Sequence, residues 1–222
     1  MGLRWPILAA AAVVHALLIV APAWLAALLR GEAPRLSLDC CALLLLAGAW
    51  GVLEARWTSR HSRDAGAPGR APALQGALLW LLMVCAASRL LVAPGPPVGA
   101  ALVGLGVGLR LAAIRGLGEH FRTRLEGAPD QPLITTGLYA WIRHPSELGN
   151  GCIVLGLATL ADAGAFVALV AAAALLLVHA RVRAEDAALA RGHGARFVAH
   201  AAAVGACSPL RACISRLRKR ER

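Results

Sequence analysis

Apolar residues in this chain gather in long blocks and do not alternate regularly with polar residues. Three blocks cover about residues 5–29, 38–57 and 74–93, and a fourth runs from the Pro-Gly turn at 94–97 to residue 114. A helix needs about 20 apolar residues to cross the hydrocarbon core of a bilayer. Each block is therefore predicted to form a membrane helix.

Two shorter apolar stretches follow, at residues 148–160 and 165–179, separated by the sequence Ala-Asp-Ala-Gly at 161–164. Stretches of roughly 13 to 15 residues are short for a full span. They predict a tight helical hairpin that dips into the bilayer or just crosses it. The fold class expected is an all-α, polytopic integral membrane protein with five or six membrane helices, the last two forming this hairpin.

Composition supports a membrane protein. Of the 222 residues, 59% are hydrophobic and only 16% are charged, and the mean hydropathy is +0.65, whereas soluble domains are about 25% charged. These values argue against a soluble enzyme, a secreted disulfide scaffold and a disordered chain. The six cysteines include no CxxC motif and no Cys/His pair at zinc spacing, so no metal site is predicted.

The net charge of +11 indicates an orientation in the membrane. Basic residues collect in the second loop (58–72), in segment 115–143 and in the tail (211–222), which the positive-inside rule assigns to the cytoplasm. We expect a multi-pass protein of the bacterial inner-membrane type with both termini cytoplasmic. Anionic membrane lipids are expected partners, and nucleic acid is not.

Two features within the spans have structural interpretations. Glycines at 104, 106 and 108 resemble a dinucleotide loop, but no strand flanks them, so close helix packing through Gly104 and Gly108 is favoured. Arg89 and Arg110 lie near span ends, where long basic side chains extend toward the interface.

The candidate chemistry begins in the polar segment 118–149, which contains GLYAWIRHPSELG at 137–149. Pro145 suits the first turn of a helix, and Glu147 would lie in that turn, where negative charge is favoured. Arg143 and His144 would then stand at a helix entrance, beside backbone N–H groups that can hold an anion.

A second charged cluster follows the hairpin and contains Arg181, Glu185 and Asp186. Arg181 and Glu185 are four residues apart, so they share one face of a helix, and the plain interpretation is a weak surface ion pair. A hairpin of two short helices brings its ends together, however. We therefore predict that this face lies beside the Arg143–His144 entrance and that the two clusters form a site.

The two clusters together resemble the isoprenylcysteine carboxyl methyltransferase and phospholipid methyltransferase-like family of integral membrane proteins. The resemblance covers residues 118–209, under half of the chain. The matching positions are Gly137, Tyr139, Arg143, His144, Pro145 and Gly149 in the first motif, and Arg181, Glu185, Leu189 and Gly194 in the second. The chain departs from the family pattern at four positions: Glu147, Asp186, Phe197 and His200.

The resemblance implies a membrane methyltransferase that uses S-adenosylmethionine and takes a lipophilic acceptor from the bilayer. It implies three segments: amino-terminal membrane helices (1–117), a methyltransferase-like core (118–210) and a basic tail (211–222). It assigns catalysis to Arg143, Arg181 and Glu185, with Arg181 contacting the substrate. The implied cofactor contacts are Glu126, Gln131, Pro132, Leu133, Ile134, Tyr139, His144, Pro145, Ser146, Glu147 and Glu185.

The residue types suit this chemistry. A carboxylate such as Glu185 can accept hydrogen bonds from a ribose diol, and His144 or Arg143 can bind a carboxylate. A carboxylate acceptor needs no general base, whereas a thiol or amine needs one, for which Glu185 or a nearby histidine is a candidate. An isoprenylcysteine carboxylate is the favoured acceptor. Two alternatives stay open: an enzyme like the NADPH-dependent membrane sterol reductases, and a non-catalytic membrane scaffold.

Overall fold

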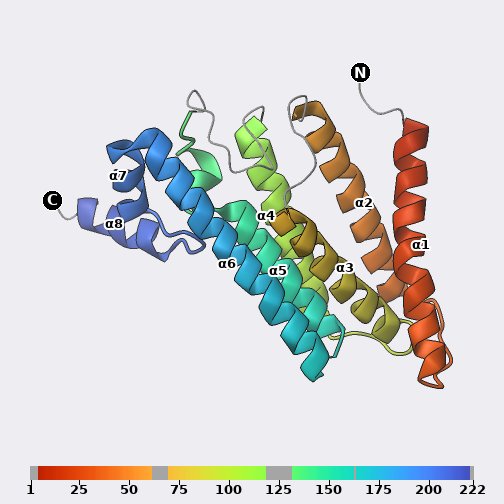
Figure 1. Ribbon diagram of the computed structural model, residues 1–222. Coiled ribbons are helices and arrows are strands. Elements are labelled where there is room, and N and C mark those ends of the chain that lie inside the picture. The colour runs from red at the N-terminus through yellow and green to blue at the C-terminus, as the bar shows by residue number, and fades with distance from the viewer. Residues whose placement is uncertain (1–4, 62–69, 119–131, 163, 221–222) are drawn as a thin grey trace. The chain divides into compact units, whose positions relative to one another are not determined.

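The computed structural model describes residues 5–61, 70–118, 132–162 and 164–220. Its helices are coloured along the chain in Figure 1. They are α1 (Trp5–Leu29), α2 (Leu38–His61), α3 (Arg70–Leu90), α4 (Pro97–Leu117), the 3-10 helix η2 (Gly137–Ala140), α5 (Pro145–Leu160), α6 (Ala165–His193), α7 (Ala195–Ala203) and α8 (Leu210–Arg220).

The all-α prediction is confirmed for the described residues, which contain no strand and a single isolated β-bridge, between Ile142 and Gly205. Among them, three helical segments are long and apolar enough to cross a membrane: Ala73–Leu90, Pro97–Leu117 and Ala165–His193. Two shorter apolar helices lie at Ala16–Leu29 and Leu38–Trp50. The chain is thus an integral membrane protein by composition and helix length, and the number of five or six spans stays a prediction.

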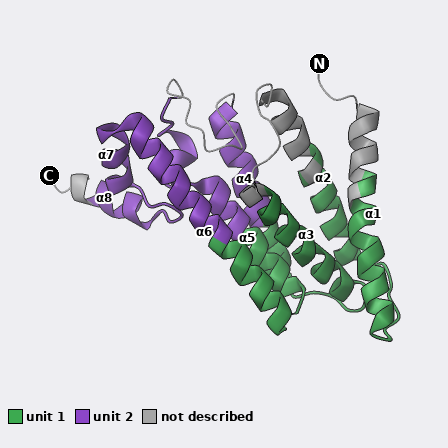
Figure 2. Ribbon diagram, in the orientation of Figure 1, with its two compact units in different colours: residues 1–104, 152–176 green, residues 105–151, 177–222 purple. Residues whose placement is uncertain are grey.

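The chain divides into two compact units, shown in green and purple in Figure 2. Unit 1 comprises residues 1–104 and 152–176, and unit 2 comprises residues 105–151 and 177–222. The predicted boundaries at 117 and 210 follow the sequence motifs, whereas these units cut through α4, α5 and α6.

Unit 1 is held together by rows of small and apolar side chains. On α1 the buried residues Ile19, Ala23 and Ala27 are spaced by four, so they lie on one face of the helix. Cys40 and Leu43 are buried on α2. Such rows let α1 pack against both α2 and α3.

Glycines permit close helix contacts, but not at the two positions predicted. In unit 2, a Cβ built on Gly149 of α5 would lie 2.6 Å from the carbonyl oxygen of Gly106 on α4. In unit 1, a Cβ on Gly156 would lie 2.7 Å from the carbonyl oxygen of Gly99. The prediction of packing through Gly104 and Gly108 is wrong, because a Cβ at either would meet nothing within 4 Å.

The second helix of the expected hairpin is longer than predicted. Helix α5 has 16 residues, close to the expected length, but α6 has 29 residues and runs without a break to His193. The charged residues beyond position 179 do not end the helix, because Arg, Glu and Ala all have high helix propensity. The helix ends where Gly194 adopts a φ of +52°, a conformation that glycine adopts without steric cost.

Candidate functional site

The first motif forms a short turn that leads into α5. Residues Gly137–Ala140 make η2, and Gly137 has a φ of +58°. Helix α5 begins at Pro145, as predicted, with Glu147 in its first turn. His144 directly precedes the helix, and its carbonyl oxygen accepts a hydrogen bond from the N–H of Leu148 at 3.0 Å. The sequence therefore places His144 at the helix entrance through the fixed φ of Pro145.

The backbone N–H groups at this helix entrance form hydrogen bonds with a segment that lies about 60 residues later in the chain. The N–H of Arg143 donates to the carbonyl oxygen of Gly205 at 3.0 Å, and the N–H of His144 donates to that of Ala206 at 2.8 Å. The segment 204–206, between α7 and α8, thus holds the motif by main-chain hydrogen bonds. No side-chain pattern in the sequence indicates this contact.

The His144 ring lies between two carboxylates of α6. Its Nε2 is 2.7 Å from Asp186 Oδ1, and its Nδ1 is 3.3 Å from Glu185 Oε2. The side chain is only 2% exposed. Burial alone would lower the pKa of His144, but its hydrogen bonds and charge interactions with Glu185 and Asp186 outweigh burial and raise the pKa. This arrangement favours an imidazolium that donates from both nitrogens.

Arg143 is bound on several sides. Its Nη2 lies 2.7 Å from Asp186 Oδ2, its Nε donates to Asp186 Oδ1 at 3.3 Å, and its Nη1 donates to the carbonyl oxygens of Ala201 and Val204. The guanidinium carbon lies 5.9 Å from the centroid of the Phe197 ring. Arg143 therefore joins the motif to α6 and to the end of α7.

Glu147 and Arg181 form the second ion pair, with Arg181 Nε 2.9 Å from Glu147 Oε1. The other carboxylate oxygen of Glu147 accepts from Asn150 Nδ2 at 3.0 Å. Glu147 is buried. The clusters at the start of α5 and along α6 are thus neighbours, as predicted, and Arg181 of α6 pairs with Glu147 of α5.

Arg110 of α4 extends this network. Its Nη1 donates to Ser146 Oγ at 3.0 Å and to Asn150 Oδ1 at 3.3 Å. The residue is 9% exposed. The prediction that Arg110 extends toward the interface is therefore wrong, because its guanidinium is buried against α5. Arg89 is partly exposed, with its Nε 3.4 Å from the Asp162 carboxylate.

Together these side chains form one group, called here the polar cluster. With His144 protonated it contains four cations and three carboxylates. Its ionisable members are Arg110, Arg143, His144, Arg181, Glu147, Glu185 and Asp186.

Sequence reasoning missed Arg110 and Asn150. A signal for Arg110 existed, since an arginine within an apolar helix generally faces protein or a polar cavity. Asp186 was predicted as part of the second charged cluster but was given no role, and its carboxylate contacts both Arg143 and His144.

The predicted cofactor contacts fall into three groups: residues outside the described part of the chain, buried residues and residues that a ligand could reach. Glu126 and Gln131 lie outside the described residues. Tyr139, His144, Pro145 and Glu147 are buried, and the Tyr139 hydroxyl donates to the Ala113 carbonyl oxygen at 3.3 Å. Burial raises the pKa of Tyr139, so it stays a neutral phenol.

The remaining predicted contacts are accessible to a ligand to differing extents. Pro132 is exposed, and Leu133, Ile134, Ser146 and Glu185 are partly exposed. The Glu185 side chain is 38% exposed although Oε2 contacts His144. A ligand would therefore meet Glu185 and Ser146 at the edge of the polar cluster.

Comparison with known proteins gives one family. Residues 99–191 match the model of the Isoprenylcysteine carboxyl methyltransferase (ICMT) family, which is under half of the 222 residues. The match begins earlier than the motifs predicted and includes Arg110 on α4. No curated protein matches the chain. The resemblance is thereby confirmed, and residues 99–191 of this membrane protein are similar to the isoprenylcysteine carboxyl methyltransferase family of membrane methyltransferases.

Proposed function

We propose that this protein transfers a methyl group from S-adenosylmethionine to a lipophilic acceptor taken from the bilayer, with carboxyl O-methylation of an isoprenylcysteine-like carboxylate favoured. The observation that carries the proposal is the polar cluster of unit 2, which lies within the residues that match the methyltransferase family. Buried charges are costly unless they are paired. A cluster of this size in so apolar a chain is therefore better explained by a site than by stability.

The residues at the edge of the cluster fit the methyl donor. The partly exposed Glu185 carboxylate can accept hydrogen bonds from a ribose diol. Ser146 and the first N–H groups of α5 stand at a helix entrance, where the helix dipole favours an anion such as the amino-acid carboxylate of the donor. The 3.3 Å contact with His144 holds Glu185 in place without burying it.

Arg181 is the residue proposed to bind an acceptor carboxylate. Glu147 holds it through Nε, which fixes the plane of the guanidinium. When bound, S-adenosylmethionine supplies a methyl group that passes in line to the acceptor oxygen, while the electron pair of the broken S–C bond stays on sulfur. A carboxylate acceptor loses no proton, so the residues would act by alignment and by exclusion of water. A thiol or amine acceptor would need a base, for which the partly exposed Glu185 or a nearby histidine is a candidate.

Binding of S-adenosylhomocysteine to the detergent-purified full-length protein tests the proposal. We expect calorimetry to show binding that Glu185→Gln weakens about tenfold or more, because the amide replaces a charged acceptor. Glu32→Gln is the matched control, since it makes the same chemical change at an exposed Arg30 ion pair. Absence of binding to folded wild-type protein would refute the proposal.

Two further experiments distinguish the methyltransferase from the reductase and scaffold alternatives and test the acceptor. Binding of NADPH in place of S-adenosylhomocysteine would favour the reductase, and binding of neither ligand would favour the scaffold. Transfer of labelled methyl from S-adenosylmethionine to a prenylcysteine analogue, but not to its carboxamide, would identify the carboxylate as the acceptor.

A further inference from the structure

Helix α8 presents an apolar row away from the protein. Leu210, Ile214 and Leu217 are spaced by four and three, so they lie on one face of the helix. They are 68%, 50% and 60% exposed. The sequence alone predicted only a basic tail from residue 211, and the structure shows instead a helix with two distinct faces.

The opposite face of α8 is fixed to the rest of unit 2. Ala212 is 1% exposed, and the Ser215 hydroxyl donates to the Ala203 carbonyl oxygen of α7 at 3.3 Å. The Arg216 guanidinium lies 3.6 Å from the centroid of the Trp141 ring and donates to the Ala140 carbonyl oxygen. These contacts set the rotation of α8 about its axis, and the apolar row is exposed as a result.

Basic residues accompany the row. Residues 211–222 contain six basic residues and one acidic residue. At about 100° per residue, the exposed Arg211 follows one edge of the row. Helices that lie in the plane of a membrane show this arrangement, because arginine extends to the phosphates while the apolar row enters the acyl region.

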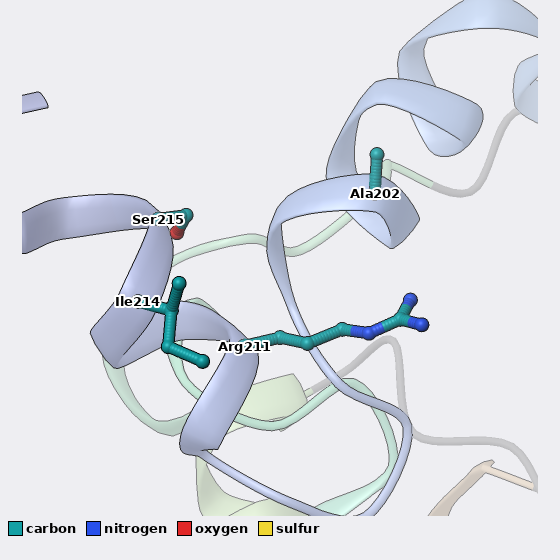
Figure 3. Close-up of a pocket in the computed structure, with 4 residues that line it drawn as sticks. All are labelled: Ala202, Arg211, Ile214 and Ser215. Carbon is teal, nitrogen blue, oxygen red and sulfur yellow. The ribbon is translucent and has the colours of Figure 1, made fainter. Parts of the chain in front are cut away.

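A hollow beside α8 combines the same two chemistries. It has a volume of about 310 Å³ and is lined by Ala202 of α7 and by Arg211, Ile214 and Ser215 of α8. Figure 3 shows the Arg211 side chain extending from α8 on the side where Ala202 of α7 lies, with Ile214 on the following turn of α8. A guanidinium beside an apolar side chain suits a phosphate group attached to an acyl chain.

We infer that α8 is an in-plane membrane helix that binds the anionic phospholipids of the leaflet it faces. The row of Leu210, Ile214 and Leu217 enters the acyl region, and Arg211 binds a phosphate beside it. Anionic lipid is favoured over a soluble partner because the chain is an integral membrane protein and residues 211–222 carry a large excess of basic residues. The inference does not depend on the methyl-transfer proposal, because none of the residues of α8 belongs to the polar cluster.

Hydrogen exchange of the full-length protein in nanodiscs tests this inference. We expect the amides of α8 to exchange about tenfold more slowly in discs of mixed phosphatidylcholine and phosphatidylglycerol than in discs of phosphatidylcholine alone. Ile214→Glu combined with Leu217→Glu should abolish the protection. Val198→Glu is the matched control, since it places the same acid on the exposed face of α7 and should leave the α8 amides protected.

Exchange of the α4 and α5 amides in the same samples shows whether each variant is folded. Arg211→Gln with Arg218→Gln should remove the difference between the two lipid mixtures, and Arg191→Gln on α6 should not. Equal exchange of α8 in both lipids, unchanged by the two glutamates, would overturn the inference. So would protection that appears only in discs carrying two copies of the protein, because the apolar row would then cover a second copy.

Discussion

The two units use polar side chains in opposite ways. In unit 1 the described ion pairs, Arg30–Glu32 and Arg89–Asp162, lie at exposed positions, and the helices meet through small apolar residues. In unit 2 the ion pairs of Arg143 and His144 with Asp186 involve side chains that are largely buried. Exposed pairs contribute little to stability, whereas buried pairs are costly to form and more costly to break. The difference indicates that the helices of unit 1 are held by apolar packing, whereas unit 2 buries charged side chains, as the methyl transfer proposed above would require.

Removing Asp186 should produce the largest difference between the units. Asp186→Ala leaves Arg143 and His144 without their shared carboxylate, and we expect it to lower the free energy of unfolding by about 3 kcal/mol. Asp162→Asn removes a carboxylate that is 79% exposed, keeps a residue type that tolerates the φ of 61° at this position, and should change it by less than about 0.5 kcal/mol. Unfolding of both variants in one detergent, followed by tryptophan fluorescence, measures this. Equal losses would mean that burial does not distinguish the two pairs.

Gly149→Ala tests whether unit 2 also depends on close helix packing. The added Cβ would lie 2.6 Å from the Gly106 carbonyl oxygen, so α4 and α5 must separate, at a cost of about 1 to 3 kcal/mol. Gly108→Ala on the same helix pair meets nothing within 4 Å and should be neutral or stabilising by up to about 1 kcal/mol. The same unfolding measurement compares them. A loss at Gly108 as large as at Gly149 would contradict the packing described here.

Raising the pH should remove only the His144 part of the unit 2 network, a smaller effect than deleting Asp186. The pKa of His144 is raised in the folded protein, so its contribution is present below the ordinary value of 6.5 and is lost as the pH rises through the folded value. The free energy of unfolding should therefore fall above pH 6.5. Subtracting the pH profile of His144→Gln isolates the effect. If the two profiles are parallel, the imidazolium does not contribute.

Arg216→Ala should have the smallest effect. It removes the stacking on Trp141, a contact worth about 0.5 to 1 kcal/mol at an exposed site. Stability measured by denaturation should change by no more than that, and Arg211→Ala is the comparison on the same helix. A loss matching that of Asp186→Ala would place α8 within the core of unit 2.

Block lengths and motif spacing predict much of this molecule. The block at 5–29 coincides with α1, and Pro145 marks the start of α5 because its fixed φ suits a first helical turn. The proximity of the two charged clusters also follows from the helix order. The direction in which a side chain faces cannot be predicted from block lengths and motif spacing. Gly104 and Gly108 lie on one face of α4 and Gly106 lies on the opposite side, and only the packed helix shows that Gly106 meets α5.

Arg110 shows the same limit of sequence reasoning. Its position near the end of an apolar block is compatible with a side chain that extends to the interface. Its burial depends on Ser146 and Asn150, which lie 36 and 40 residues later in the chain. The partner of Arg181 is another case, since the sequence spacing offered Glu185 on the same helix as the plain interpretation, whereas the structure shows an ion pair with Glu147 on α5.

The hydrogen bonds from Arg143 and His144 to Gly205 and Ala206 have a consequence for biosynthesis. During translation the motif emerges from the ribosome about 60 residues before the carbonyl groups that close it. The helices α5 and α6 are therefore synthesised while the backbone of the motif still lacks its partners. A chain truncated before residue 205 would contain the motif without the carbonyl groups that accept hydrogen bonds from Arg143 and His144.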